Sequence, residues 1–480
     1  MIRSSWLFFL SSSFWLGLFF YQLSLYTIWS TVVCLTVGII FCLKYQKLNF
    51  YLASLLISTT TVGGSLYGVY HPINLEYLVL DNVNLPFLWL TSFFCPYIML
   101  SINQIKSNPR IYGGSLLLIQ FLLTALFSTN NFFCFYILFE VLAFPMFILI
   151  GVYGQQVARI PAAYKFFIYT FAGSVAMLVG LISFYFFYGS TNCRLVTDYQ
   201  SQGFLFFLVF LALAVKIPMV PVHLWLPEAH VEAPTGVSVL LAALLLKTGG
   251  YGMLRFVWPM LPGGVHFWSS TLIVLALVSV IVGSFTAIAQ IDLKKTIAYS
   301  SVAHMNVSLL GLLSGVEAIQ FSVYLMLAHA FVSAGLFTSV GIIYDRYHTR
   351  SIRNLRGLNL YMPSLYFWSF FLILGNFSFP LTANFSAEIV IMFEVTQRSL
   401  LVGLTAGVTV LASTIYSMWY FSRIFNGYPL PVNSYQDCSP QEWSLLVVNV
   451  CGMLGLGLFG GVFQQHSTED YCWLLFVEQL

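Results

Sequence analysis

Apolar runs long enough to cross a lipid bilayer follow one another along almost the whole chain, and this feature decides the fold class. A helix needs about 20 apolar residues to span the hydrocarbon layer. Hydrophobic residues make up 59% of the 480 residues and charged residues only 7%, and the mean hydropathy is +0.87. No alternating polar and apolar strand pattern is present, which argues against a membrane barrel. The sequence therefore predicts an all-α, polytopic transmembrane helix bundle.

The apolar runs predict about fifteen membrane helices joined by short loops. Because no loop has room for a soluble domain, we expect a single membrane domain over residues 1–480. The first run lacks the small-residue cleavage pattern of a signal peptide, so we interpret it as a retained helix. The predicted spans are residues 5–24, 27–43, 50–70, 85–104, 113–129, 132–152, 166–188, 204–226, 235–254, 269–290, 297–315, 319–343, 366–394, 400–422 and 444–463.

Basic residues are distributed unevenly between the two predicted ends of the bundle. With fifteen crossings, the side of the N-terminus carries fourteen of the nineteen Lys and Arg residues, and the other side carries three. Loops on the cytoplasmic or matrix side are enriched in Lys and Arg. We therefore place the N-terminus on that side and the C-terminus on the opposite side. The four arginines of the loop 344–365 are interpreted as solvated charge or lipid head-group contacts.

The other two basic residues, Lys216 and Lys247, lie inside predicted spans. Lys216 comes directly before Pro218 and Pro221, which cannot donate backbone hydrogen bonds and should free the carbonyls of Ala214 and Ile217. A charged side chain at the bilayer centre costs roughly 2.5 to 3.5 kcal/mol on insertion scales and tends to mark an ion or proton path. We therefore favour a functional role for these lysines over a structural one.

A second predicted helix break lies near Pro380, within the span 366–394. A polar run there leads directly to Glu388 in the sequence N-F-S-F-P-L-T-A-N-F-S-A-E. Discontinuous helices at corresponding places in two halves are the sequence signature of a transporter with internal repeats. We predict two inverted-topology repeats, residues 113–254 and 269–422, with broken helices near Pro218 and Pro380.

Further ionisable residues lie inside the apolar spans. Glu140 is isolated in one helix, and a facing Lys216 would hold both groups in their charged forms. His304 and His329 are placed to pass protons or to hydrogen-bond across helix interfaces. Taken together, the side chains predict a proton path along the middle of the membrane, with water and hydroxyl groups bridging the gaps. The candidate residues are Glu140, Lys216, Lys247, His304, His329 and Glu388.

The sequence gives no sign of a metal or cofactor site. Its eight cysteines are scattered singly, without a C-x-x-C motif or Cys/His ligand spacing. Glycine-rich phosphate loops are also missing, and Gly249-Gly250 is interpreted as a place of close helix packing.

Several segments carry a resemblance to a known family. F-Y-I-L-F-E-V around Glu140, A-A-Y-K-F-F-I-Y-T-F-A-G-S, K-I-P-M-V-P-V-H-L-W-L-P-E-A-H-V-E-A-P-T from Lys216, L-L-K-T-G-G-Y-G and D-L-K-K-T-I-A-Y-S-S-V-A-H-M-N resemble the antiporter-like subunits of respiratory complex I. The resemblance covers roughly residues 75–465. Glu388 stands where sister subunits of that family typically have a lysine. The alanine after His329 and the one before Glu388 replace usual glycines, which puts local helix packing in question more than the proton groups.

The resemblance implies a proton-pumping membrane subunit of NADH:ubiquinone oxidoreductase with fourteen core helices, so the helix 5–24 would be an addition. It implies that the six candidate residues carry the protons and that NADH, flavin, iron–sulfur clusters and ubiquinone bind in partner subunits. Expected partners are the other membrane-arm subunits, including the sister antiporter-like subunits, and membrane lipids including cardiolipin, but no nucleic acid. The expected location is the mitochondrial inner membrane; a bacterial plasma membrane or a thylakoid remains an alternative.

Two other functions stay open at this point. The chain is also compatible with a subunit of a stand-alone cation/proton antiporter, because such subunits share these motifs. A non-conducting membrane scaffold is the third hypothesis, and it would require all of the buried ionisable groups to serve packing alone.

Overall fold

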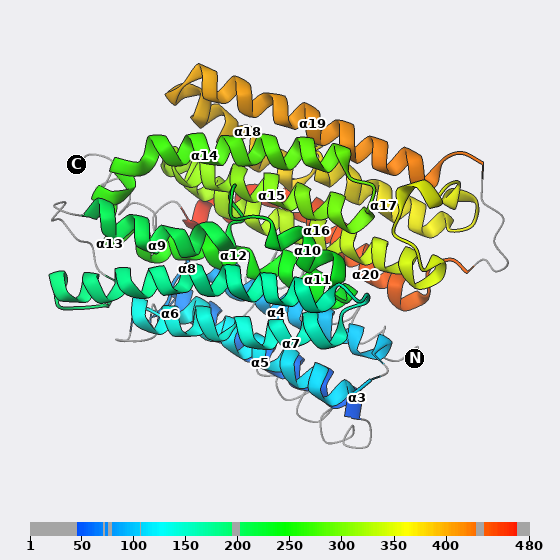
Figure 1. Ribbon diagram of the computed structural model, residues 1–480, viewed down its shortest axis with the longest axis horizontal. Coiled ribbons are helices and arrows are strands. Elements are labelled where there is room, and N and C mark those ends of the chain that lie inside the picture. The colour runs from blue at the N-terminus through cyan, green and yellow to red at the C-terminus, as the bar shows by residue number, and fades with distance from the viewer. Residues whose placement is uncertain are drawn as a thin grey trace.

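The molecule is a bundle of helices that lie side by side along a common direction (Figure 1). The computed structural model describes residues 46–70, 73–74, 79–105, 107–193, 202–428 and 436–467. The predicted spans 5–24 and 27–43 lie outside the described residues, and so do both chain ends.

The predicted all-α fold is confirmed, and each predicted span from residue 50 onward falls on a helix or a broken helix. Among the described residues, nine helical segments are long and apolar enough to cross a membrane. The one small sheet is an antiparallel hairpin of β1 (Ile73–Asn74) and β2 (Val79–Leu80). The helices are α3 (Gln46–Tyr70), α4 (Leu85–Met99), η1 (Leu100–Gln104), α5 (Pro109–Ser128), α6 (Phe132–Val141), α7 (Ala143–Tyr153), α8 (Arg159–Tyr188), α9 (Gln202–Lys216), α10 (Trp225–Glu232), α11 (Thr235–Leu240), η2 (Leu241–Leu245), α12 (Lys247–Gly252), η3 (Met253–Val257), α13 (Trp258–Met260), α14 (Pro262–Ala289), α15 (Leu293–Leu312), α16 (Val316–Tyr347), η4 (Ile352–Asn354), η5 (Leu358–Leu360), α17 (Pro363–Asn376), α18 (Ala383–Arg398), α19 (Leu400–Phe425) and α20 (Pro440–Ser467).

Backbone hydrogen bonds tie the loops together at two opposite ends of the bundle. At one end, the Gln155 N–H donates to the Glu232 carbonyl, and Leu293 donates to Arg350. We call this the positive-rich end, because the basic loops around residues 154–165, 290–295 and 344–365 meet there. At the other end, the positive-poor end, Phe132 donates to Thr191 and Cys193 to Asn130.

The arginines of the α16–α17 loop are not all solvated, so that interpretation is wrong for two of them. Arg346 makes two hydrogen bonds with the Glu442 carboxylate, of 2.6 and 3.0 Å. Arg350 is only 5% exposed and lies at 3.9 Å from Glu232 and 3.7 Å from Asp292. Arg346, in the last turn of α16, thus pairs with α20, whereas Arg350, in the loop that follows, lies beside carboxylates at the end of α10 and the start of α15. Arg353 and Arg356 are exposed.

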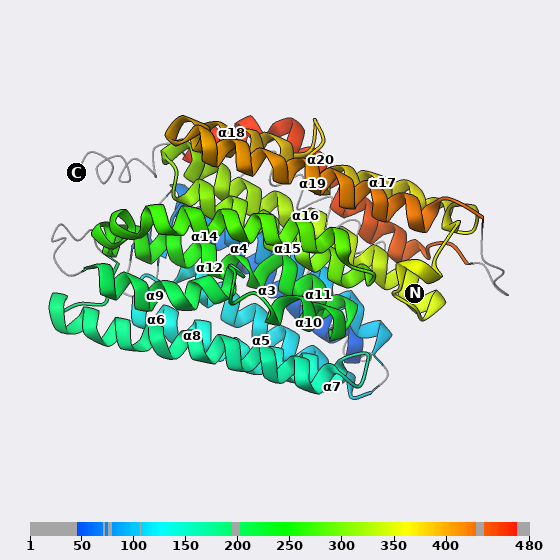
Figure 2. The same cartoon turned by 45° about the horizontal axis from the view of Figure 1, so that its top comes forward.

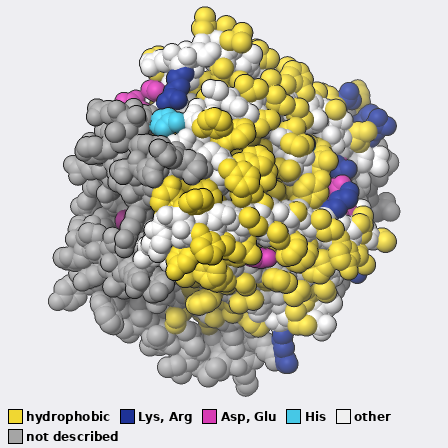
Figure 3. Space-filling model, turned by 60° about the vertical axis from the view of Figure 1, so that its left-hand side comes forward, with side chains coloured by type: hydrophobic (Ala, Val, Ile, Leu, Met, Phe, Trp, Pro, Cys, Tyr) yellow, Lys and Arg dark blue, Asp and Glu magenta, His cyan; other side chains and the backbone are white. Residues whose placement is uncertain are grey.

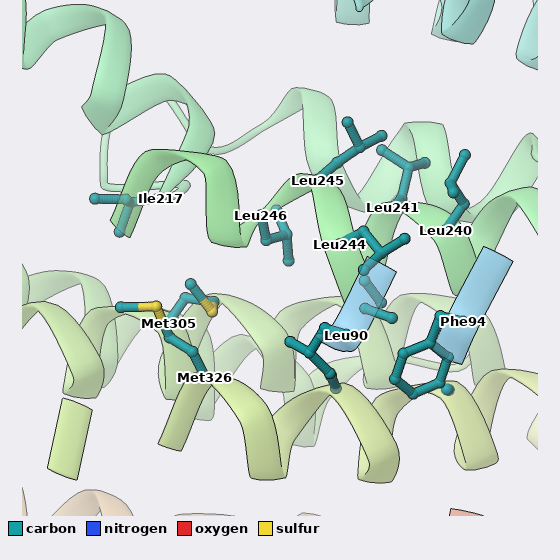
Figure 4. Packing of buried hydrophobic residues seen from close by; sticks show 14 of the residues in the cluster. Leu90, Phe94, Ile217, Leu240, Leu241, Leu244, Leu245, Leu246, Met305 and Met326 are labelled. Atoms are coloured by element: carbon teal, nitrogen blue, oxygen red, sulfur yellow. The ribbon is translucent and has the colours of Figure 1, made fainter. Parts of the chain in front are cut away.

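A fully enclosed helix, Thr235–Met260, runs through the middle of the bundle (Figure 2). In its most apolar stretch of 18 residues, every residue is buried. A helix that is apolar on all sides finds its stable place inside other protein. Figure 4 shows its leucines, among them Leu241 and Leu244, beside Leu90 and Phe94 of α4. The helix also packs against α9 and α16, which carry Lys216 and His329.

The outer helices present apolar side chains to the surroundings. Apolar side chains cover most of the described surface in Figure 3, and charged ones are few. The most exposed membrane spans are α8 and α19. In each, only 39% of the most apolar 18-residue stretch is buried. Such a surface matches the hydrocarbon of a bilayer, where apolar side chains need no cover.

The two broken helices run in opposite directions across the bundle. In Figures 1 and 2, the chain passes from α9 on the left to α10 on the right, whereas it passes from α17 on the right to α18 on the left. An inverted repeat requires this relation. The repeat limits 113–254 and 269–422 themselves stay predictions.

Candidate functional site

The first helix break follows Lys216, and side chains from three other places stabilise its free backbone groups. The Trp225 indole donates to the Val215 carbonyl at 3.0 Å, Asn306 donates to the Pro218 carbonyl at 3.2 Å, and the Val220 N–H donates to Ser279 at 2.9 Å. The predicted free carbonyl of Ala214 is wrong, because it accepts the Met219 N–H at 3.0 Å. The backbone register shifts by one residue at the break, and the Val215 carbonyl is the one that accepts the Trp225 indole.

Lys216 is 3% exposed, and its ammonium faces aromatic rings rather than a carboxylate. Its Nζ lies 5.0 Å from the ring centre of Phe139 and 5.5 Å from that of Phe166. Cation–π attraction of this kind supplies about 0.5 to 2 kcal/mol. The described residues include no ion pair between Lys216 and Glu140, so the predicted pair is not formed in this structure.

Glu140 borders a small outward-facing pocket between α6, α7 and α8. The pocket is lined by Glu140, Phe144, Phe171 and Ser174, among others. Phe144 and Phe171 are themselves exposed, at 53% and 48%. Glu140 and Phe139 are successive residues on α6, and only Phe139 lies under the Lys216 ammonium. The position of Glu140 beside the outer surface explains why the pair is open here.

Lys247 lies at the end of a π-helical turn in the enclosed helix. Within η2, the Leu246 N–H donates to the Leu241 carbonyl, five residues earlier, instead of to Ala242. The Ala242 carbonyl is thereby available, and Lys247 Nζ donates to it at 2.5 Å. Single π-helical turns occur frequently at functional sites. This turn stabilises a completely buried ammonium in the middle of the bundle.

Gly249 and Gly250 allow neighbouring helices to approach Lys247 closely, which confirms the predicted packing role. A Cβ on Gly249 would lie 2.8 Å from Ile217 Cγ1 and 3.1 Å from Lys216 Cβ. A Cβ on Gly250 would collide with Met326 of α16. The two glycines therefore bring the Lys216 break and α16 against the segment that carries Lys247.

Lys247 contacts His329 directly across the interface with α16. Lys247 Nζ lies 3.0 Å from His329 Nδ1, and both side chains are at most 2% exposed. The other ring nitrogen, His329 Nε2, lies 3.1 Å from the Ser301 hydroxyl of α15. An imidazole with a hydrogen-bond partner on each nitrogen can accept a proton on one side and release one on the other.

His304 and Glu388 form the second contact pair, at the second helix break. His304 Nδ1 lies 2.8 Å from Glu388 Oε1, and the Ser378 hydroxyl donates to Glu388 Oε2 at 2.6 Å. The two ionisable side chains are 5% and 8% exposed. Ser378 belongs to the broken segment between α17 and α18, so the break itself supplies a donor to the carboxylate.

The two pairs lie next to each other. The imidazole rings of His304 and His329 have centres 5.6 Å apart. His304 Nε2 has no hydrogen-bond partner among the described residues. One water molecule or a small ring movement would close this gap. A small cavity bordered by Ser300, Asn376 and Tyr416, among others, lies one helical turn from His304 on α15.

The structure thus brings four of the six predicted residues together, in the order Lys247, His329, His304, Glu388. The first two and the last two are in direct contact, and the two histidine rings lie next to each other. The structure does not connect Glu140 or Lys216 to them by a hydrogen bond or ion pair within the described residues. The sequence analysis missed Ser301 and Ser378. The only indication in the sequence is that Ser301 lies near a histidine and Ser378 near a helix break. The sequence analysis also assigned Lys294 to a loop, although this side chain is 0% exposed.

Comparisons with known proteins identify the family of this chain. A family model described as NADH:quinone oxidoreductase/Mrp antiporter, TM, matches residues 129–414. NADH-ubiquinone oxidoreductase chain 4 of Chondrus crispus is 39% identical over 85% of this chain and 83% of its own length. The protein of the same name from Arabidopsis thaliana is 40% identical over 82% of this chain and 81% of its own length.

A solved structure has the same fold. A chain of respiratory complex I from Thermus thermophilus superimposes with a TM-score of 0.80 at 26% identity, and the match covers 92% of this chain and 99% of that chain. The matched family region, residues 129–414, contains every candidate residue from Glu140 to Glu388.

Proposed function

This chain belongs to the NADH:quinone oxidoreductase/Mrp antiporter transmembrane family, and we propose that it is the chain 4 subunit of an NADH:ubiquinone oxidoreductase and moves protons through its buried ionisable residues. It is a membrane subunit of the enzyme, whose redox reaction takes place in other subunits. The observation that supports proton transfer most directly is the pair of buried contacts, Lys247 with His329 and His304 with Glu388.

Burial of these groups is costly, which favours function over scaffolding. Hydrophobic side chains of similar volume would pack there without a desolvation penalty, and replacing a buried ion pair by such side chains is often neutral or stabilising. Lys247 has no carboxylate within ion-pair distance among the described residues, so no ion pair offsets its charge. A proton carrier needs such a group, since it must gain and lose a proton during each cycle.

Complex I is favoured over a stand-alone antiporter. The family description covers both kinds of protein. The similar curated proteins, however, carry the name NADH-ubiquinone oxidoreductase chain 4 and align over most of their length. On this basis we propose a place in the membrane arm. Contact with sister antiporter-like subunits and with lipids including cardiolipin is part of the same proposal and rests on the sequence resemblance.

We place the subunit in the mitochondrial inner membrane, with its positive-rich end at the matrix. The similar proteins from a red alga and a plant carry the ubiquinone-linked name, and the positive-inside rule assigns the basic loops to the matrix side. In this assignment, NADH, flavin, iron–sulfur clusters and ubiquinone bind in partner subunits.

Glu140 and Lys216 complete the proposal as a pair that opens and closes. In the open form Lys216 lies over aromatic rings. Approach of the Glu140 carboxylate would favour the charged form of the lysine. Closure of the pair would therefore change the tendency of Lys216 to pass a proton towards Lys247.

Purification and pumping assays test this function together. The chain is isolated in mild detergent, its bound proteins are identified, and NADH-driven proton pumping is measured in vesicles with wild type and Lys247→Met. We expect flavin and iron–sulfur subunits to co-purify, and Lys247→Met to lower pumping at least tenfold in an assembled complex. Co-purification with antiporter subunits alone would support the second hypothesis. Wild-type pumping by Lys247→Met would refute the proton path.

A further inference from the structure

Asn306 is a completely buried amide on α15 that the proton path described so far does not use. Its side chain is 0% exposed. Its Nδ2 donates to the Val302 carbonyl, four residues earlier on the same helix, at 2.8 Å, and to the Pro218 carbonyl at 3.2 Å. The first bond stays within α15, whereas the second joins α15 to the first helix break. Buried polar side chains in membrane bundles characteristically make such bonds between elements.

The neighbouring helix α14 holds the same break at a second residue. The Val220 N–H donates to the Ser279 hydroxyl of α14 at 2.9 Å. α14 lies directly against α15, since a Cβ on Gly283 would be only 3.1 Å from the Ala303 nitrogen. Closely packed protein interiors transmit a displacement because they hardly compress. The first break is therefore fastened at two residues to a single pair of helices.

The other side of α15 carries contacts to both buried pairs. His304 Nδ1 lies 2.8 Å from Glu388 Oε1, and the Ser301 hydroxyl lies 3.1 Å from His329 Nε2. Because an α-helix turns by about 100° per residue, Asn306 projects about 160° away from His304. α15 thus lies between the first helix break on one side and the two pairs on the other.

A movement at Asn306 reaches both pairs through a short stretch of α15. His304 and Ser301 are within about one and a half turns of Asn306 on a continuous helix. The contacts respond to small displacements, because a shift of about 1 Å would lengthen the 2.8 Å contact between His304 and Glu388 beyond hydrogen-bond range. A small displacement of the first break therefore suffices to open or close the second pair.

We propose that Asn306 is a positioning residue that couples the first helix break to the two buried pairs through α15. When Lys216 moves, the backbone of the break moves with it, and the hydrogen bond from Asn306 to Pro218 carries the displacement into α15. The displacement changes the distance between His304 and Glu388 and so controls when a proton passes between them. This coupling rests on the proposed proton-pumping function and deepens it, because it supplies a link between the two helix breaks.

Replacing Asn306 by serine removes the link and leaves the rest of α15 intact. A serine hydroxyl in a helix donates to a carbonyl three or four residues earlier, as Ser300 and Ser308 do on this helix. Asn306→Ser therefore keeps a hydrogen bond within α15, but its hydroxyl is too short to reach Pro218.

Asn449→Ser is the matched control. Asn449 of α20 is also 0% exposed, and its Nδ2 makes the same two kinds of bond. It donates to the Leu445 carbonyl, four residues earlier, at 2.8 Å, and to the Tyr97 hydroxyl of α4 at 2.9 Å. Both serine variants lose one hydrogen bond between helices, so both should lower the thermal midpoint of the purified complex to a similar extent.

Only Asn306→Ser should impair pumping. NADH-driven pumping and the number of protons pumped per NADH oxidised are measured in vesicles that contain the assembled complex. We expect Asn306→Ser to lower pumping about fivefold, the shift that loss of one neutral hydrogen bond produces in a two-state equilibrium. The number of protons per NADH should fall as well, because the first break then moves without the pairs. Asn449→Ser should match wild type in both measurements.

The same vesicles distinguish failure of the coupling from failure of the proposed function. If Lys247→Met abolishes pumping while Asn306→Ser matches wild type, the coupling is refuted and the proton path stands. Equal losses of pumping in Asn306→Ser and Asn449→Ser would also refute it, since any lost bond between helices would then have the same effect. If Lys247→Met pumps normally, the proposed function itself fails. Should Asn306→Ser not assemble, Asn306→Leu, which fills the volume of the amide without a donor, decides by the same criteria.

Discussion

Replacing Glu388 by glutamine tests the His304–Glu388 contact most directly. The change keeps the size of the side chain, and the amide oxygen can still accept the Ser378 hydroxyl. It removes the negative charge that faces His304 Nδ1 at 2.8 Å. Two unit charges about 4 Å apart attract each other by about 4 kcal/mol at an effective dielectric constant of about 20. Because this pair is almost completely buried, solvent screens the attraction little.

The substitution therefore leaves His304 without its anionic partner at the second helix break. The glutamine also cannot take up a proton itself. We therefore expect Glu388→Gln to lower proton pumping by at least a hundredfold, while the loss of folding stability stays within about 1.5 to 3 kcal/mol, the range for a hydrogen bond to a charged group.

The assay measures NADH-driven acidification in vesicles that contain the assembled complex, with assembly checked on native gels. Glu388→Asp is the control: it keeps the charge on a shorter side chain and should retain part of the pumping. The reasoning is refuted if Glu388→Gln assembles and pumps as fast as wild type. Complete loss of assembly in Glu388→Gln, with normal assembly in Glu388→Asp, would indicate that the charge serves structure.

Three further changes test other contacts. Gly249→Ala should lower the free energy of unfolding by about 1 to 3 kcal/mol, because the added methyl group overpacks the first helix break. The thermal midpoint of the purified complex should fall with it. Gly407→Ala, whose added methyl group would have no heavy atom within 4 Å, should leave the midpoint unchanged. Arg255→Met removes the 2.6 Å ion pair with Asp81 at the positive-poor end and should destabilise the complex by about 1.5 to 3 kcal/mol without changing the pumping ratio of protons to electrons; an altered ratio would contradict this. Ser378→Ala removes one donor to the buried carboxylate and should slow pumping severalfold with normal assembly, and wild-type pumping would show that the hydroxyl is dispensable.

The sequence alone determined the fold class, the positions of the spans and the helix breaks. Crossing a membrane is a property of about 20 consecutive residues, because each helix satisfies its own backbone hydrogen bonds and faces an apolar medium. For the same reason a lysine, histidine or glutamate inside a span stands out without knowledge of its neighbours. All six candidate residues were selected in this way, and their role in proton transfer stays a prediction.

Only the tertiary structure decided which of these residues touch. The contact partners are far apart in the chain: 82 residues separate Lys247 from His329, and 84 separate His304 from Glu388. Whether such groups meet depends on the rotation and depth of each helix, which packing fixes and hydropathy does not encode. The same packing turned Lys216 towards aromatic rings instead of Glu140, and it buried Lys294 although its position beside a loop suggested exposure.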